Sequence, residues 1–259
     1  MERLVVFSDV LCPWATVVVL RLHAARARAG ADDELAIVHR ALPLELLLER
    51  PVARRVVDAE IPLCASLTPD FGWSLWQGRP EEYPSTSLLA AEAIQGAAAQ
   101  STRAAEELDL ALRRAFFAES RCISMRHEVL AAASSCPGVD LDRLTRGLDA
   151  GAFRSAVTAD FRASRAEGIP CSGTVVLPDG TAVCNPGTTT AWIGGRMPRG
   201  TPVLVDDDPT AYDRLVAQAC GTMAPCASCR NLARPTTSRT PTCSWCPTAR
   251  RWGRGSRST

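Results

Sequence analysis

The stretch Leu4-Val5-Val6-Phe7-Ser8-Asp9-Val10-Leu11-Cys12-Pro13-Trp14-Ala15 decides the fold of this chain. Residues 4–10 are almost continuously apolar and rich in β-branched side chains, which predicts a buried strand. Residues 13–29 carry apolar side chains at helical spacing, and Gly30 is suited to ending a helix. Because proline is favoured at the first position of a helix, we expect Cys12 at or beside the helix N-cap.

A cysteine at a helix N-terminus is predisposed to react. Its sulfur faces backbone N–H groups that have no partner within the helix, and it faces the positive end of the helix dipole. Both favour the thiolate, so we expect the pKa of Cys12 to lie below the ordinary value of about 8.5. The alternative is an inert thiol that only fills the core.

Ala15 stands where a redox pair of the form Cys-x-x-Cys would carry its second cysteine. In such a pair the first sulfur attacks a disulfide, and the second releases the mixed intermediate. Three possibilities therefore remain for Cys12. A small thiol resolves the intermediate, a distant cysteine resolves it, or the site no longer performs redox chemistry.

The rest of the chain predicts an α/β fold. Residues 34–42 are a second expected strand, so the chain begins with a strand–helix–strand unit that favours a parallel pair. Residues 45–167 show mainly helical spacing, although residues 61–80 are interrupted by prolines and a glycine and receive no assignment. A hairpin is expected over residues 174–184 around Pro178-Asp179-Gly180, followed by a helix from Pro209 to about residue 220. The expected order is βαβ, a long helical insertion, and ββα.

Length and composition fit one large domain in residues 1–222 and a tail in residues 223–259. Of the 259 residues, 46% are hydrophobic and 22% charged, and the net charge of +1 predicts no strong attraction to nucleic acid or to a membrane surface. The start of the chain lacks the basic and apolar regions of a signal peptide, and no apolar run approaches the roughly 18 residues that span a bilayer. We therefore expect a cytoplasmic location.

The tail holds two cysteine pairs, Cys226-x-x-Cys229 and Cys243-x-x-Cys246, separated by 13 residues. Four thiolates at this spacing could hold a tetrahedral zinc ion. From Ala224 onward, however, there are seven arginines, no acidic residue and no apolar periodicity. This composition favours a disordered segment over a zinc site.

Three segments in order resemble the DsbA-like thioredoxin-fold family, in particular its FrnE-type and 2-hydroxychromene-2-carboxylate isomerase-like branch. They are residues 8–14 with Cys12-Pro13, residues 111–121 with Phe116-Phe117, and residues 168–176. Together they cover the chain from about residue 2 to residue 220. The resemblance implies a thioredoxin-like fold with a helical insertion over about residues 45–167.

The resemblance also implies where an active site lies. In this family a cis-proline loop lines the active cysteine, but the proline is replaced here by Gly173. A cis bond before a residue other than proline costs about 2.5–4 kcal/mol, so we expect a trans bond and permissive backbone angles at Gly173. The loop implies that Cys171 approaches Cys12 to disulfide distance and serves as its partner, the alternative being a small residue that fills a tight turn. The implied substrate-contacting residues are Pro13, Trp14, Ser172, Gly173 and Thr174.

The expected function is that of a thiol–disulfide oxidoreductase or thiol transferase acting through Cys12. Its substrate is then a small-molecule or protein thiol or disulfide. No cofactor is required, and a low-molecular-weight thiol is a candidate co-reactant. The isomerase-like relatives bind a glutathione-like thiol and position it with a Ser or Cys at this turn. A small-thiol-dependent isomerase or transferase is therefore the first alternative, and a non-catalytic binding module that keeps the fold is the second.

Overall fold

The computed structural model describes residues 1–195, 197 and 199–221. One sheet has the strand order β2-β1-β3-β4. β1 (Glu2–Ser8) runs parallel to β2 (Leu35–Ala41) and antiparallel to β3 (Thr174–Val176), which in turn pairs with β4 (Ala182–Cys184). The predicted parallel pair and the predicted hairpin are confirmed. Residues far apart in the chain therefore meet at the centre of the sheet.

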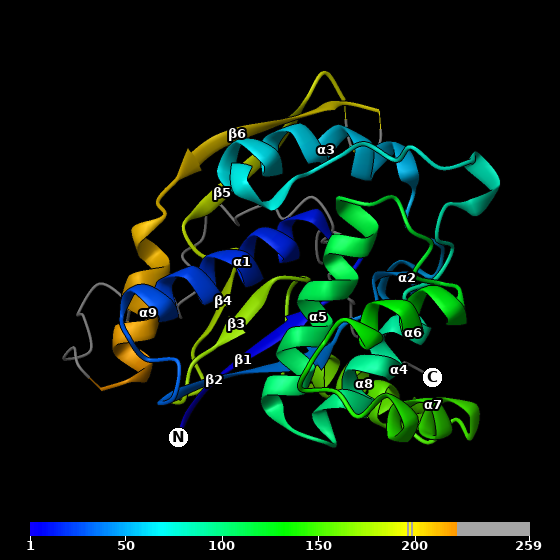
Figure 1. Ribbon diagram of the computed structural model, residues 1–259. Helices are drawn as coiled ribbons and strands as arrows, with labels where there is room; N and C mark the ends of the chain where they lie inside the picture. The colour runs from blue at the N-terminus through cyan, green and yellow to red at the C-terminus, as the bar shows by residue number, and fades with distance from the viewer. Residues whose placement is uncertain (196, 198, 222–259) are drawn as a thin grey trace, which may run out of the picture.

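The helices α1 (Pro13–Arg28) and α9 (Thr210–Ala219) cover one face of this sheet (Figure 1). Alternate residues of a strand point to opposite faces. Leu4 and Val6 of β1 accordingly pack with Val18 of α1, whereas Phe7 packs on the other face against Ile169. The sheet therefore has one face covered by α1 and an opposite face on which Phe7 packs.

The chain between β2 and β3 is helical. Its largest core cluster surrounds α5, whose buried residues Leu108, Leu112 and Phe116 recur at helical spacing. Within the stretch that the sequence left unassigned, a helix runs through Pro62, a residue that ordinarily ends helices. The helices of this insertion are α2 (Leu44–Leu48), α3 (Arg54–Leu67), α4 (Leu88–Ala98), α5 (Thr102–Phe117), α6 (Arg126–Ser134), α7 (Leu141–Asp149) and α8 (Arg154–Ala166).

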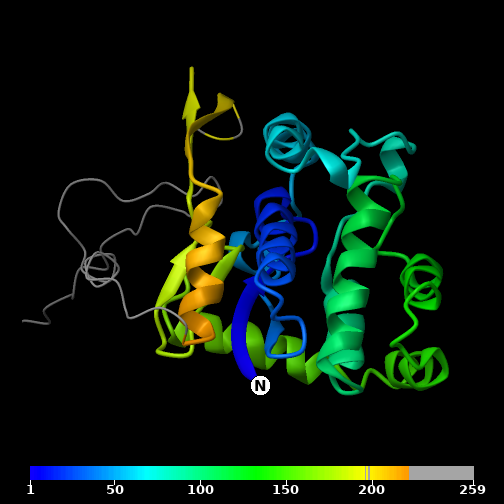
Figure 2. The same ribbon diagram turned by 60° about the vertical axis from the view of Figure 1, so that its left-hand side comes forward.

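A separate antiparallel hairpin of β5 (Thr188–Ile193) and β6 (Thr201–Asp207) was not predicted from the sequence. Figures 1 and 2 show it beside α3, on the side of the molecule where α3 lies over α1. Trp192 of β5 packs against the large core cluster, and Asp207 of β6 accepts hydrogen bonds of 2.6 and 2.8 Å from Arg21 of α1. The hairpin is thus tied to the helix that begins at Cys12.

The turn at Pro178-Asp179-Gly180 forms as predicted. Gly180 has a φ of 84°, and its N–H donates to the carbonyl of Leu177 at 2.9 Å. The helix expected after Pro209 is α9. In the part of the chain that the structure describes, no helix has the length and apolar character needed to cross a bilayer. The predicted tail, with Cys226, Cys229, Cys243 and Cys246, lies outside the described residues.

Candidate active site

Cys12 is the N-cap of α1, and Pro13 is the first residue of that helix, as predicted. The Cys12 sulfur accepts a hydrogen bond from the N–H of Ala15 at 3.4 Å. The Cys12 carbonyl accepts the N–H and the hydroxyl of Thr16, both at 3.1 Å. The first turn of the helix therefore directs a backbone N–H at the sulfur, an arrangement that stabilises a thiolate.

Asp9 shapes the turn that precedes Cys12. One carboxylate oxygen accepts the N–H of Leu11 at 2.8 Å, and the other accepts the N–H of Leu44 at 2.6 Å and the hydroxyl of Ser87 at 3.0 Å. The Asp9 carbonyl accepts the N–H of Cys12 at 3.2 Å. Burial raises the pKa of Asp9 to about 6, although the hydrogen bonds that its carboxylate accepts from Leu11, Leu44 and Ser87 oppose the rise. The carboxyl group thereby joins the turn to α2 and to the start of α4.

Arg113 of α5 holds the same turn from the opposite side. Its guanidinium donates to both carboxylate oxygens of Asp109, at 2.7 and 2.9 Å, and to the Ser8 hydroxyl at 2.8 Å. It also donates to the Asp9 carbonyl at 3.2 Å and to the Thr16 hydroxyl at 3.0 Å. Because this side chain is fully buried, its hydrogen bonds offset the cost of removing the charge from water. Arg113 thus fixes the backbone on both sides of Cys12.

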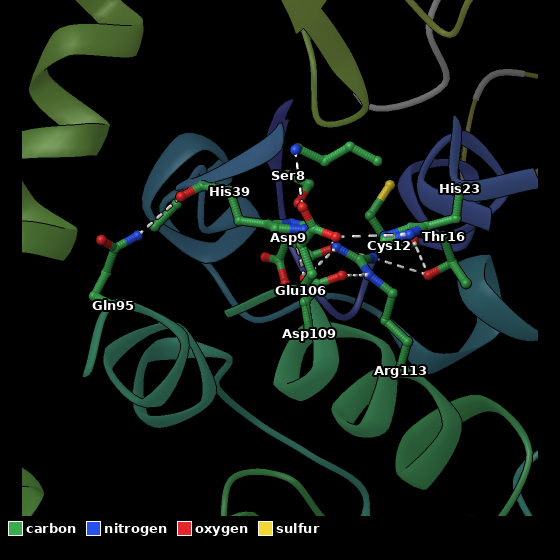
Figure 3. Close-up of polar contacts among 12 residues, drawn as sticks. Ser8, Asp9, Cys12, Thr16, His23, His39, Gln95, Glu106, Asp109 and Arg113 are labelled. Atoms are coloured by element: carbon green, nitrogen blue, oxygen red, sulfur yellow. Dashed lines mark hydrogen bonds and ion pairs between the residues drawn. The ribbon is translucent and has the colours of Figure 1, made fainter. Parts of the chain in front are cut away.

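A second charged cluster continues along α5 (Figure 3). Glu106 accepts hydrogen bonds of 2.9 and 2.7 Å from Arg26, and its carboxylate also accepts the N–H of Ile37 at the edge of the sheet, at 2.9 Å. His23 lies beside this pair, and burial followed by the charge of His39 lowers the pKa of His23 to about 4. These groups attach α5 to α1 and to β2.

His39 borders a cavity of about 20 Å³ that is also lined by Asp9, Ser87 and Asp109. The ring nitrogen Nδ1 of His39 lies 3.4 Å from a carboxylate oxygen of Asp109. A cavity of this size has room for one water molecule and none for a substrate.

Among the described residues, no group of three or more His, Cys, Asp or Glu side chains is placed to hold a metal ion.

The sulfur of Cys12 points away from these polar clusters (Figure 3). Cys12 and Ala15 are 0% exposed and Trp14 is 2% exposed. Cys12 belongs to the core cluster that also contains Val57 and Cys64 of α3. A substrate can therefore reach the sulfur only when part of this cover opens.

The loop before β3 faces the Cys12 turn, as the resemblance implied. Gly173 has a φ of 89°, the permissive conformation expected there. A Cβ atom at Gly173 would lie 3.2 Å from the Cα atom of Ala15 and 2.6 Å from the side-chain oxygen of Asn185. The neighbouring Ser172 hydroxyl accepts the N–H of Asp9 at 2.9 Å. Backbone approach of this closeness requires glycine at position 173.

The expected pairing of Cys171 with Cys12 is wrong. Cys171 forms a disulfide with Cys184 of β4, with a Cα–Cα distance of 6.2 Å. In the sheet Cys184 pairs with Thr174, and Thr174 pairs with Phe7, so these side chains share the face on which Phe7 packs. That face is opposite to α1. The Cys171 side chain therefore turns away from the helix that carries Cys12.

The residues that the resemblance implied for substrate contact are all buried. The Thr174 hydroxyl donates to the Cys171 carbonyl at 2.8 Å, so it stabilises its own loop. The indole N–H of Trp14 lies in the core and has no hydrogen-bond acceptor among the described residues. A substrate-binding role stays a prediction for each of these residues, which are Pro13, Trp14, Ser172, Gly173 and Thr174.

Cys64 of α3 is a second thiol near Cys12 that the sequence did not single out. It is 0% exposed and belongs to the same core cluster as Cys12. Burial raises the pKa of the Cys64 thiol well above its ordinary value, and the charges of Glu60 and Cys12 raise it further. Cys64 carries no sequence motif, because its proximity to Cys12 arises from the packing of α3 against α1.

The fold has clear counterparts among solved structures. A protein from Streptomyces coelicolor described as a probable DsbA oxidoreductase matches with a TM-score of 0.59 and 19% identity, over 87% of this chain and 93% of that one. The cytosolic disulfide reductase DsbM from Pseudomonas aeruginosa matches with a TM-score of 0.54 and 19% identity, over 70% and 87%. A 2-hydroxychromene-2-carboxylate isomerase matches with a TM-score of 0.52 and 16% identity, over 70% and 87%. No protein-family model and no curated protein matches the sequence.

These likenesses confirm the predicted fold class. The protein has the α/β, thioredoxin-like fold of DsbA-like oxidoreductases and related isomerases, with helices inserted between β2 and β3. At this level of identity these likenesses show the architecture and do not show the chemistry.

The sequence identified Cys12 and its loop, but it missed Asp9, Arg113 and Cys64. One signal was available for Arg113, because Asp109 and Arg113 are an i, i+4 charge pair on a helix whose other buried residues, apart from Glu106, are apolar.

Proposed function

We propose that this protein is a thiol–disulfide oxidoreductase or thiol transferase that acts through Cys12. The observation that carries the proposal is the hydrogen bond from the Ala15 N–H to the Cys12 sulfur at the start of α1. A thiolate at that position is stabilised by the helix N-terminus and attacks a disulfide to form a mixed disulfide. The buried hydrogen bonds of Asp9 and Arg113 hold the turn in the geometry that this attack needs.

Three further expectations belong to this proposal. The substrate is a small-molecule or protein thiol or disulfide, since thiol exchange needs no other cofactor. A low-molecular-weight thiol returns the protein to its starting state. The protein works in the cytoplasm, and its likeness to a cytosolic disulfide reductase supports that location.

A small-thiol-dependent isomerase or transferase is the second candidate. The likeness to a 2-hydroxychromene-2-carboxylate isomerase and the single cysteine of the Cys12-Pro13-Trp14-Ala15 turn favour it. In that case the sulfur positions a bound thiol and is not oxidised. Turnover of an aromatic substrate with glutathione, without any disulfide reduction, would support this candidate.

The rate of alkylation by iodoacetamide as a function of pH tests the main proposal. We expect Cys12 to react with a midpoint below about 8.5, measured by peptide mass spectrometry. Cys136 is a matched internal control, because it is also buried and burial raises its pKa. A Cys12 midpoint as high as that of Cys136 would indicate a thiol that only fills the core, and would favour the non-catalytic binding module.

A further inference from the structure

α3 contributes a second buried sulfur, Cys64, to the core cluster that contains Cys12. The buried positions of α3 include Val57, Ile61 and Cys64, which share one face of that helix. This face packs against α1, and Figure 1 shows α3 alongside α1. Cys12 and Cys64 are both completely buried and belong to one core cluster.

The electrostatics of the two thiols are coupled. A negative charge on Cys12 raises the pKa of Cys64, as expected for two thiols buried in the same core cluster. Burial and the charge of Glu60 act in the same direction. In the resting protein Cys64 therefore stays protonated while Cys12 is the nucleophile.

Formation of a mixed disulfide changes this balance. Once the Cys12 sulfur is bonded to a substrate sulfur it carries no charge, and one cause of the raised pKa of Cys64 disappears. The Cys64 thiol then loses its proton more readily at the stage when a second thiolate is needed. The reactivity of Cys64 is thereby linked to the state of Cys12.

We propose that Cys64 is the resolving thiol for Cys12 and supplies from α3 the sulfur that Ala15 does not supply. The proposal rests on the proposed function, because it assigns the second step of the same reaction. It replaces Cys171, whose sulfur is bonded to Cys184 on the opposite face of the sheet. Among the described cysteines outside that disulfide, Cys64 is the one that shares the core cluster of Cys12 and stands on a helix packed against α1.

The reaction proceeds in two balanced steps. The Cys12 thiolate attacks a substrate disulfide, a Cys12–substrate S–S bond forms, and the first substrate thiolate leaves and takes up a proton. Cys64 then loses its proton, and its thiolate attacks the Cys12 sulfur. A Cys12–Cys64 bond forms, and the second substrate thiolate leaves and is protonated. Two electrons pass to the substrate, and two molecules of a low-molecular-weight thiol restore the protein while they become a disulfide.

The test follows the fate of a mixed disulfide on Cys12. Full-length protein, Cys64→Ser and the control Cys136→Ser are reduced, freed of reductant and exposed to hydroxyethyl disulfide. Aliquots are blocked with acid and alkylating agent, cleaved after arginine without reduction, and analysed by mass spectrometry. Cleavage at Arg21 and Arg55 places Cys12 and Cys64 on different peptides, so a bond between them appears as a linked pair.

In the wild type and in Cys136→Ser we expect the Cys12 adduct to decay as the Cys12–Cys64 peptide appears. In Cys64→Ser the adduct should persist at least tenfold longer. Equal adduct lifetimes in all three proteins, with no linked peptide, would overturn the role of Cys64 and leave the proposed function intact. Absence of any Cys12 adduct would overturn both. If Cys64→Ser fails to fold, the linked peptide in the wild type decides the question, since it needs no substitution.

Discussion

At the scale of single residues, buried charged side chains hold the Cys12 turn in place. Arg113 is fully buried and donates to four different residues around the Cys12 turn. Burial is the largest single influence on Asp109 and opposes its ionisation. The charge and hydrogen bonds of Arg113, together with the neighbouring histidines, outweigh it and hold the pKa of that carboxyl below its ordinary value. Such a pair contributes little net stability when intact, but its disruption leaves one charge unpaired in the core.

Substitution Arg113→Met should lower the free energy of unfolding by about 3–5 kcal/mol, because it leaves the Asp109 carboxylate without its partner in the core. Urea unfolding measures this change. The control is Arg126→Met, which removes a half-exposed pair with Asp149 and should cost less than about 1 kcal/mol. Equal costs for the two variants would contradict the role assigned to Arg113.

The stability of the protein at mild acidity depends on His23. Its pKa is about 4 in the native state and 6.5 in the unfolded chain. Between these values the unfolded chain binds the proton and the native protein does not, so stability falls as pH drops from 6.5 to 4. His23→Gln removes this proton uptake and should reduce the loss of unfolding free energy between pH 7 and pH 5 by about 2 kcal/mol.

Urea unfolding at the two pH values measures the effect of His23→Gln. Asp9 acts in the opposite direction between about pH 4 and 6, because its raised pKa makes the native state retain a proton that the unfolded chain has lost. Its contribution is the same in both proteins and cancels in the comparison. The matched control is His127→Gln on α6, whose side chain is 73% exposed. A pH dependence identical to that of the wild type in both variants would show that His23 is not held neutral.

At the scale of secondary structure, the loop before β3 and the first turn of α1 form one unit. The N–H of Gly173 donates to the carbonyl of Phe7 at 2.9 Å, and its own carbonyl accepts the N–H of Asn185 at 3.0 Å. The closeness of this loop to Ala15 leaves no room for a side chain at Gly173. The loop and the first turn of α1 therefore pack together at the distance of backbone contact.

Gly173 and Gly180 have similar left-handed backbone angles but different surroundings. Substitution of each by alanine therefore distinguishes the cost of backbone strain from the cost of steric crowding. Gly180 has a φ of 84°, and a Cβ atom added there would meet no other atom of the described residues within 4 Å. Gly173 has a φ of 89°, and a Cβ atom added there would meet Asn185 at 2.6 Å and Ala15 at 3.2 Å. Gly180→Ala should cost about 1–2 kcal/mol from the left-handed backbone alone. Gly173→Ala should cost about 1–3 kcal/mol more, because the added methyl displaces Asn185 or α1. Equal urea midpoints for the two variants would contradict the crowding.

At the scale of the whole molecule, residues distant in sequence close the fold. The Cys171–Cys184 disulfide joins the loop before β3 to the edge strand β4. Residues of α3 belong to the core cluster that buries Cys12, and Trp192 of the β5–β6 hairpin packs against the same cluster. The Cys12 turn itself is held from both sides by the hydrogen bonds of Asp9 and Arg113.

Removal of the disulfide by Cys184→Ser should lower the free energy of unfolding by about 2–4 kcal/mol, because the cross-link restrains a 13-residue separation in the unfolded chain. Wild-type protein unfolded in the presence of a reductant should behave like this variant. The control Cys220→Ser changes a cysteine outside any disulfide of the described residues and should shift stability by less than about 1 kcal/mol. Unfolding curves of the wild type that are indifferent to reductant would contradict a stabilising role for this bond.

Local sequence determined the elements whose signals are short-range. Apolar runs, Pro13 at a helix start and the Pro178-Asp179-Gly180 turn act within a few residues, so β1, α1 and the β3–β4 hairpin were predictable, as was the N-cap position of Cys12. Tertiary packing decided what surrounds that sulfur. The strand register turned Cys171 to the far face and paired it with Cys184, while the docking of α3 on α1 brought in Cys64. These outcomes depend on how separate elements pack against one another, for which the local spacing of side chains carries no signal.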